Sequence, residues 1–305
     1  MRHVLLLLFL LGPAFTAAAN YRLQIGNVLW NGSPGGYNCF SSSEYPNTVN
    51  FFLTKTKPGN RSYAVTAGPS ANTGDYQRQL AAGTDRLNYQ LYTSSARSFI
   101  LKAPPTATPG EVISGGGNDR EGTVIPLSFT FNIPPNQLVL PGTYTDQITV
   151  SIYDRYNDNG APFDTRTITF TVVVAAGASL SLVPSGSGFS SHSSQNMNFG
   201  SLSQGQNLGC DLLVRKNAGC SLAFSSRNGG VMKMIPTPTA DQVPYSCTVS
   251  GNPLPLANPA QINLPAGVSP SQDGNRLPVR ITIGDLGSAA AGDYQDEITI
   301  TLVAN

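Results

Sequence analysis

Charge is scarce in this sequence. Charged residues make up 11% of its 305 residues, against about 25% in an ordinary soluble domain. Without the first 19 residues the count is 18 − 1 = 17 basic against 17 acidic side chains. A neutral chain has no long-range attraction to nucleic acid or anionic lipid, so we expect neither as a partner.

Histidine is nearly absent, and this argues against an enzyme. His3 lies in the N-terminal apolar segment, and His192 lies in the serine-rich stretch 190–194. A Ser–His catalytic pair in that stretch competes with a solvated loop, and the loop is the better interpretation because dense serines make chance neighbours unavoidable. Cys/His spacing for zinc is also missing. We therefore predict no enzyme activity, no metal site and no cofactor.

Two short segments weakly match ligand-binding motifs. Asp154–Gly160 is similar to a calcium loop, but Tyr156 stands at a ligand position and Thr165 stands in place of the closing Glu. Gly115–Gly117 lacks the strand–helix context of a phosphate loop. We interpret the first as a turn between strands and the second as a flexible loop.

Long hydrophobic runs are absent after the first residues. Arg2 precedes the apolar run Val4–Leu11, and Ala17–Ala19 fits an A-x-A cleavage site. This pattern predicts a secretory signal peptide over residues 1–19 and export of the chain from Asn20 onward. The run is too short for a transmembrane helix, so we predict no membrane span.

Amphipathic helical patterns are absent too, and strand patterns dominate. β-branched and aromatic segments bounded by Gly, Pro, Asn or Asp recur along the chain. The pattern restarts after Ala175–Gly177. We predict an all-β protein of two immunoglobulin-like β-sandwich domains, over residues 20–175 and 176–305. The expected strands are 49–56, 63–67, 87–93, 123–131, 143–153 and 165–174, followed by segments around 180–182, 199, 212–214, 220–224, 279–283 and 298–302.

The two halves share a repeat. Pro126–Phe131 is echoed by Pro278–Ile283, and Gly142–Val150 is echoed by Gly292–Ile300. The common pattern is G-x-Y-x-D followed by alternating apolar residues. A Tyr at such a strand entry anchors its hydroxyl to the backbone in the tyrosine corner of immunoglobulin-like domains. The halves are therefore predicted to be copies of one fold.

The copies differ after the repeat. The first continues into a strand whose inward residues are Ile168, Phe170, Val172 and Val174, and the second has no such strand before Asn305. Four inward apolar residues correspond to roughly 6–10 kcal/mol of transfer free energy. We therefore expect the second domain to be incomplete and to recruit an external strand. The predicted acceptor groove is lined by Leu180, Leu182, Ile298, Ile300 and Leu302.

With both G-x-Y-x-D segments considered, the chain resembles the spore coat protein U domain family. More narrowly, it resembles the two-domain tip adhesin of archaic, Csu-type chaperone–usher pili. Further matching segments are Tyr63–Gly68, Tyr76–Arg78, Leu87–Tyr92, Ile100–Lys102, Met197–Gly200 and Asn217–Leu222.

This resemblance implies a function. A periplasmic chaperone lends a strand to such pilins, and at the outer-membrane usher the N-terminal extension of the next pilin subunit replaces it. We expect a secreted protein at the cell-surface pilus tip that attaches to an abiotic or host surface and supports biofilm formation. The alternative is a structural adaptor pilin or a spore or envelope coat protein without an adhesive role.

The cysteines depart from the family pattern. Ser194 and Lys216 stand where the family commonly has cysteines, so its disulfide cannot be transferred to this chain. The four cysteines present allow three full pairings. We prefer Cys220–Cys247, because both lie on predicted strands of the second domain, and leave Cys39 and Cys210 unassigned.

The adhesive surface is placed by topology. The linker leaves one end of the first domain, so the loops 57–62, 94–122 and 154–164 are expected at the opposite, distal end. The resemblance implies a finger-shaped adhesin domain with an apolar tip that attaches to hydrophobic surfaces. The candidate contacts are Trp30, Pro104, Pro105, Tyr156, Pro162 and Phe163, although Trp30 and Phe163 could be core residues.

Overall fold

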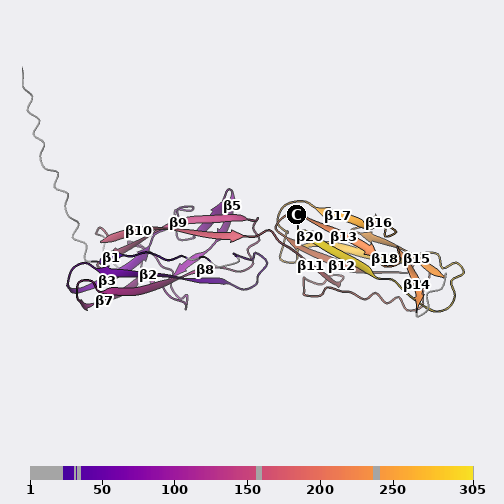
Figure 1. The fold of residues 1–305 in the computed structure, drawn as a ribbon, viewed down its shortest axis with the longest axis horizontal. Helices are drawn as coiled ribbons and strands as arrows, with labels where there is room; N and C mark the ends of the chain where they lie inside the picture. The colour runs from indigo at the N-terminus through magenta and orange to yellow at the C-terminus, as the bar shows by residue number, and fades with distance from the viewer. Residues whose placement is uncertain (1–22, 31, 33–35, 156–159, 236–240, 305) are drawn as a thin grey trace, which may run out of the picture.

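The computed structural model describes residues 23–30, 32, 36–155, 160–235 and 241–304. They form two all-β units that lie end to end and are joined by the short segment after residue 174 (Figure 1). The predicted signal peptide lies outside the described residues. Among the described residues, no helix has the length and apolar character to cross a membrane.

The N-terminal unit is a sandwich of two antiparallel sheets. In one sheet, β1 (Leu23–Ile25), β2 (Tyr45–Lys55), β8 (Val124–Ile133) and β6 (Gln90–Tyr92) follow in that order. In the other, β9 (Gly142–Tyr153) is central. β10 (Asp164–Val174) covers its whole length, and β4 (Gln79–Ala82) and β3 (Gly59–Ala67) pair with successive parts of its other edge. β5 (Asp85–Asn88) extends β4, and β7 (Ile113–Asp119) extends β3.

The C-terminal unit is also a sandwich of antiparallel sheets, and its described part has no strand that corresponds to β10. Its larger sheet has the order β11 (Ala178–Pro184), β12 (Asn207–Lys216), β18 (Asn275–Ile283), β15 (Gln242–Val249), β14 (Val231–Ile235) and β19 (Asp293–Gln295), with β16 (Asn252–Leu254) beside β15. Its smaller sheet has β17 (Ala260–Leu264), β13 (Cys220–Ser226) and β20 (Ile298–Ala304). The all-β, immunoglobulin-like prediction is confirmed.

Each unit has its own apolar core. The main core of the N-terminal unit draws on residues between Leu23 and Val174, and that of the C-terminal unit on residues between Ala178 and Leu302. At the junction, Asn217 is fully buried and holds the linker, because its Nδ2 donates to Ala175 O (2.9 Å) and its Oδ1 accepts from Gly177 N (2.7 Å).

The glycine run 115–117 was predicted to be a flexible loop, and that prediction was wrong. It lies within β7, where Gly115 pairs with Tyr63 of β3. The Tyr63 ring occupies the space that a side chain at position 115 would need. Glycine is therefore used here for close packing in a strand.

Candidate functional site

The repeated G-x-Y-x-D segments form the same contacts in both units. The Tyr144 hydroxyl donates to Leu140 O, and the Tyr294 hydroxyl donates to Ala290 O, each at 2.8 Å. These are tyrosine corners, as the sequence repeat predicted. Burial raises the pKa of Tyr144 to about 12.

The aspartate of each repeat accepts a hydrogen bond from a tyrosine hydroxyl. The Tyr89 hydroxyl donates to Asp146 Oδ2 at 2.6 Å, and the Tyr245 hydroxyl donates to Asp296 Oδ2 at the same distance. Burial, more than the carboxylate, raises the pKa of both tyrosines, so both remain protonated donors. Since these contacts match, residues 142–153 and 292–303 can be compared position by position, with numbers that differ by 150.

In the N-terminal unit, β10 closes the core. It pairs with β9 from Asp164↔Ile152 to Val174↔Gly142. Its inward side chains, the predicted self-complementing residues, are all buried, and the Phe170 ring contacts the rings of Trp30 and Phe131. The four inward residues are Ile168, Phe170, Val172 and Val174.

In the C-terminal unit, the corresponding edge is open. β20 pairs with β13 along one edge, and within the described part of the chain no strand pairs with its other edge. The consequence appears in side-chain burial. Ile148, Val150 and Ile152 of β9 are 0% exposed, whereas their counterparts on β20 are only partly buried. Those counterparts are Ile298, Ile300 and Leu302.

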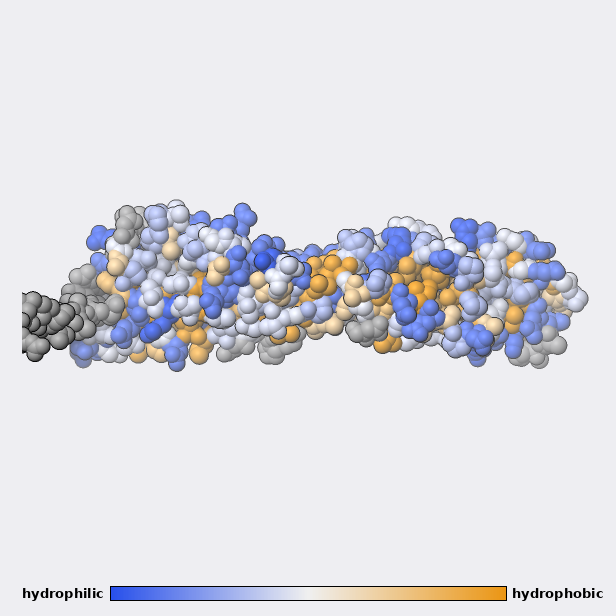
Figure 2. Space-filling model, turned by 90° about the horizontal axis from the view of Figure 1, so that it is seen from above, coloured by the Kyte–Doolittle hydropathy of each residue, from blue (hydrophilic) through white to orange (hydrophobic). Residues whose placement is uncertain are grey.

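A groove of about 500 Å³ lies along this open edge. Leu182 of β11 and Ile298 and Ile300 of β20 line it. Met197 and Phe199, from the β11–β12 connection, also line it. Of the five residues predicted for the groove, these three line it, whereas Leu180 and Leu302 pack against the same core outside the cavity. Figure 2 shows apolar residues gathered on one face of the C-terminal unit between polar ones.

The predicted Cys220–Cys247 disulfide does not form. All four cysteines are buried free thiols. Leu208 of β12 and Cys247 of β15 both pair with Ile281 of β18, so they lie at the same level of the sheet. Leu208 is eight residues from Lys216, where β12 ends, and Cys220 begins the next strand, β13, just after that end. Eight strand residues span about 27 Å, far beyond the reach of a disulfide. The correct register could not be read from cysteine spacing.

The predicted contact residues are not gathered at the distal end. Trp30 belongs to the core, with its ring 4.5 Å from Phe131 and 5.0 Å from Phe170. Phe163 also packs against the core, and Pro162 beside it is half-buried. Tyr156 lies outside the described residues.

Pro104 and Pro105 lie on the side of the unit, away from the distal end. Leu101, three residues before Pro104, donates its backbone N–H to Leu91 O (2.8 Å), and Leu91 pairs with Phe131 of β8. Strand β8 begins at the distal end with Val124, and Phe131 lies seven residues further along it. The placement of segment 94–112 at the distal end was therefore wrong.

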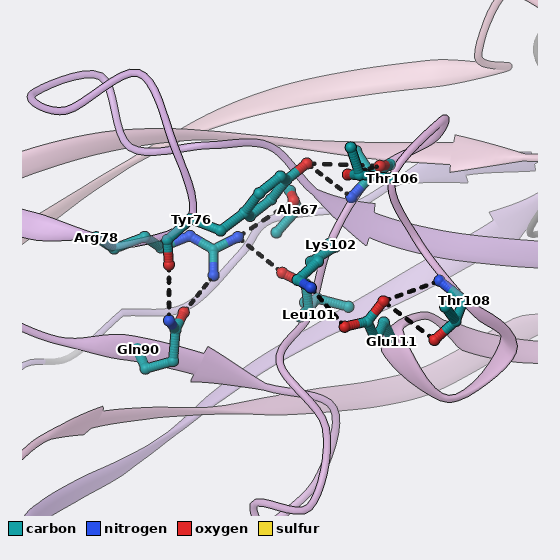
Figure 3. A network of polar contacts seen from close by, with 10 residues as sticks. Ala67, Tyr76, Arg78, Gln90, Leu101, Lys102, Thr106, Thr108 and Glu111 are labelled. Carbon is teal, nitrogen blue, oxygen red and sulfur yellow. Dashed lines mark hydrogen bonds and ion pairs between the residues drawn. The ribbon is translucent and has the colours of Figure 1, made fainter.

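A buried arginine explains why segment 94–112 lies on the side of the unit, and sequence reasoning missed this arginine. Arg78 is 1% exposed and donates to Gln90 Oε1 (2.5 Å) and to Leu101 O (2.7 Å), and Tyr76 lies beside it (Figure 3). Burial lowers the pKa of Arg78 to about 10. Because it binds backbone carbonyls, Arg78 fixes segment 94–112 against the side of the sandwich. Tyr76–Gln77–Arg78 was visible in the sequence, but burial of the Arg was not.

An exposed apolar patch lies instead on the outer face of the sheet, toward the distal end. Leu29, Phe52 and Val124 are 54%, 37% and 56% exposed, and Pro126, opposite Phe52, is exposed as well. We call these four residues the distal patch. The sequence contained a signal for this patch, because the alternation of residues along this strand places the apolar Phe52 on the solvent-facing side.

The Ser190–His192 pair does form. Ser190 Oγ lies 2.7 Å from His192 Nδ1 on an exposed loop, and Ser190 Oγ also contacts Ser181 Oγ at 3.3 Å. No carboxylate is recorded at His192 within the described part of the chain, so the orienting group of a triad is not seen there. Among the same residues, no cluster of three or more His, Cys, Asp or Glu could hold a metal ion.

Comparison with known proteins supports the family prediction. Residues 37–151 match the model of the Spore Coat Protein U domain. Among curated proteins, none matches the chain.

Several solved structures are similar to the chain. A chaperone–tip adhesion subunit complex of the archaic Csu pili of Acinetobacter baumannii is 12% identical, with a TM-score of 0.43, covering 84% of this chain and 91% of that one. The CupB6 tip adhesin of Pseudomonas aeruginosa is 10% identical, with a TM-score of 0.35 and coverage of 84% and 86%. The CFA/I adhesin CfaE of enterotoxigenic E. coli, as a mutant, is 14% identical, with a TM-score of 0.34 and coverage of 95% and 83%.

Proposed function

We propose that this protein is the tip adhesin of a chaperone–usher pilus, with a C-terminal domain that accepts a donor strand. The observation that carries the proposal is the edge of β20, which no strand of the described residues pairs with, beside a groove that reaches core side chains, where the N-terminal unit has β10. An unpaired edge beside exposed core residues favours addition of an extended strand.

The groove suits a strand better than a small molecule. It is elongated, because residues from Gly292 to Ile300 contribute along one side. The edge of β20 supplies unpaired backbone groups, and the partly buried apolar side chains alternate with outward polar ones. Main-chain pairing would provide affinity, and alternate side chains would provide specificity.

Strand acceptance is tested by co-expression with a periplasmic pilus chaperone from the same organism. We expect co-expression to yield a one-to-one complex, and the C-terminal unit of the chain purified without the chaperone to melt at a lower temperature than the N-terminal unit. A monomer of the unmodified chain that melts in two cooperative transitions, both unchanged by the chaperone, would contradict the acceptor role.

The N-terminal unit is assigned the adhesive role in this proposal. Its own strand β10 already fills the position that is open in the C-terminal unit, so this unit is free to face outward. The distal patch lies on the half that points away from the linker. Attachment through apolar desolvation would be insensitive to salt.

Adhesion is tested by replacing Phe52 and Val124 together by Ser, with Val268→Ser in the other unit as the matched exposed control. We expect about tenfold weaker attachment of piliated cells to polystyrene for the double variant, with pili still assembled. Full attachment with the patch removed would reject this surface, and loss of pili would favour the structural adaptor or coat function.

A further inference from the structure

The N-terminal unit contains a complete example of the strand that the C-terminal unit lacks. This inference rests on the acceptor role proposed above and adds the orientation, register and side-chain order of the donor. Its basis is the position-by-position match between β9 and the segment 292–303, which share the tyrosine corner and the aspartate contact.

Transfer of the β10 register places each donor side chain. Ile168 lies opposite Ile148, Phe170 opposite Asp146 and Val172 opposite Tyr144. The counterparts on the open side are Ile298, Asp296 and Tyr294, and all three line the groove. The groove wall therefore spans the positions that β10 covers in the N-terminal unit.

One position in this register takes an aromatic side chain. Phe170 contacts the Trp30 ring edge-on at 5.0 Å. Trp30 follows Val28 in the β1–β2 connection, and both pack against the core while Leu29 between them is exposed.

The second unit repeats this arrangement. Met197 and Phe199 occupy the β11–β12 connection, pack against the core on either side of the exposed Asn198, and line the groove. Phe199 thus lies, like Trp30, in the connection that follows the first strand of its unit, and among the described residues no further strand pairs with the Asp296 position as β10 pairs with Asp146.

The aspartate at this position needs no cation from the donor. Asp296 accepts hydrogen bonds from the Tyr245 hydroxyl (2.6 Å), the Ser226 hydroxyl (2.6 Å) and Asn228 N (3.0 Å). A carboxylate whose acceptor positions are filled is compatible with an apolar neighbour. An aromatic ring is therefore favoured over a Lys or Arg at this point of the donor.

We propose that the groove accepts a strand antiparallel to β20 that places one aromatic side chain opposite Asp296, against Phe199. β-branched aliphatic residues occupy the inward positions on either side, opposite Ile298 and Tyr294. The chain's own β10 sequence, residues 164–174, fits this description and serves as a probe.

The experiment uses full-length mature protein and a fluorescein-labelled peptide of residues 164–174. Binding is followed by fluorescence anisotropy. We expect the Phe170→Ala peptide to bind about 100-fold more weakly. A peptide of unchanged composition, Ile168→Phe with Phe170→Ile, is expected to bind at least about tenfold more weakly, because its aromatic residue is moved to the next inward position.

The partner side chain is tested on the protein. In the Phe199→Ala protein, the original peptide and the Phe170→Ala peptide should bind with nearly the same affinity. Phe189→Ala is the matched control, since its ring lies over Arg215 and outside the groove lining. The control protein should bind the original peptide more tightly than the Phe170→Ala peptide by the same factor as the unmodified protein does.

Orientation and register are tested by cross-linking. Thr167 lies opposite Thr149, whose counterpart is Thr299, on the outward face of β20. A Thr167→Cys peptide should form a disulfide with the Thr299→Cys protein, because directly opposed residues lie within disulfide distance. A Thr171→Cys peptide, four residues away, should not.

The outcomes separate this inference from the function on which it rests. Equal binding of the original, exchanged and Phe170→Ala peptides would overturn the aromatic position while strand acceptance stands. Efficient cross-linking of the Thr171→Cys peptide instead would overturn the register. Failure of every peptide, together with failure of the chaperone to form a complex, would overturn both.

Discussion

The two sandwiches are built on the same plan and differ at one edge. β9 lies between β3, β4 and β10, whereas β20 has β13 on one side and a groove on the other. Corresponding side chains are fully buried in the first unit and partly exposed in the second. The comparison shows that one strand, β10, distinguishes the closed edge of the first unit from the edge of the second, with which no strand of the described residues pairs. The first unit can therefore serve as the reference for experiments on the second.

The largest expected effect comes from making the units alike. A copy of residues 154–174 attached after Val303 would reproduce the β9–β10 connection, because Val303 corresponds to Tyr153. We expect it to stabilise the C-terminal unit by up to roughly 6–10 kcal/mol, the upper bound for four buried apolar side chains. Differential scanning calorimetry should show the lower transition moving up. The same copy with Phe170→Asp is the control, and an equal shift there would contradict groove filling.

The reverse change makes the first unit resemble the second. Phe170→Ala removes a fully buried ring and should cost the N-terminal unit about 3–5 kcal/mol in urea unfolding. Val173→Ala, on the same strand but 52% exposed, should change the free energy of unfolding by less than about 0.5 kcal/mol. Equal effects of the two substitutions would show that β10 does not close this core.

The paired aspartates sharpen the comparison. Asp146 is 3% exposed, whereas Asp296 is partly exposed beside the groove. Removing either carboxylate leaves a tyrosine hydroxyl without its acceptor, and this costs more where water cannot replace it. Asp146→Ala should cost about 3 kcal/mol and Asp296→Ala about 1 kcal/mol, measured in the same denaturation series. A larger loss for Asp296→Ala would indicate that the groove is closed.

The smallest expected effect concerns pH. Burial raises the pKa of Cys210 and Cys247, both in the groove lining, to about 11. Because the folded pKa lies above the ordinary value near 9, these thiols stabilise the folded state fully below pH 9, and this contribution is lost as pH rises toward 11. Iodoacetamide labelling of both should be slow at pH 8, increase between pH 9 and 11, and slow again when the groove is filled. Rapid labelling at pH 8 would contradict their burial.

Local sequence patterns predicted the strands that alternate clearly and the repeat that relates the two units. The expected strand 165–174 is β10 at 164–174, and 143–153 is β9 at 142–153. Both tyrosine corners followed from G-x-Y-x-D. These features depend on neighbours in sequence, where periodicity is informative.

The features that sequence missed depend on long-range register. Arg78 is buried because carbonyls from Ala67, Gly68 and Leu101 converge on it, and no local pattern specifies that. Gly115 lies in a strand because Tyr63 covers it. The distance between Cys220 and Cys247 follows from pairings across three strands.

Hydrogen exchange at the backbone amides of β20 tests the central claim most directly. The account predicts that the alternate amides of residues 298–304 directed away from β13 exchange at least about 100-fold faster than those of β9, and that the attached copy of residues 154–174 slows them to the β9 rate. Protection of these amides in the unmodified monomer, equal to that of β9, would contradict an open edge.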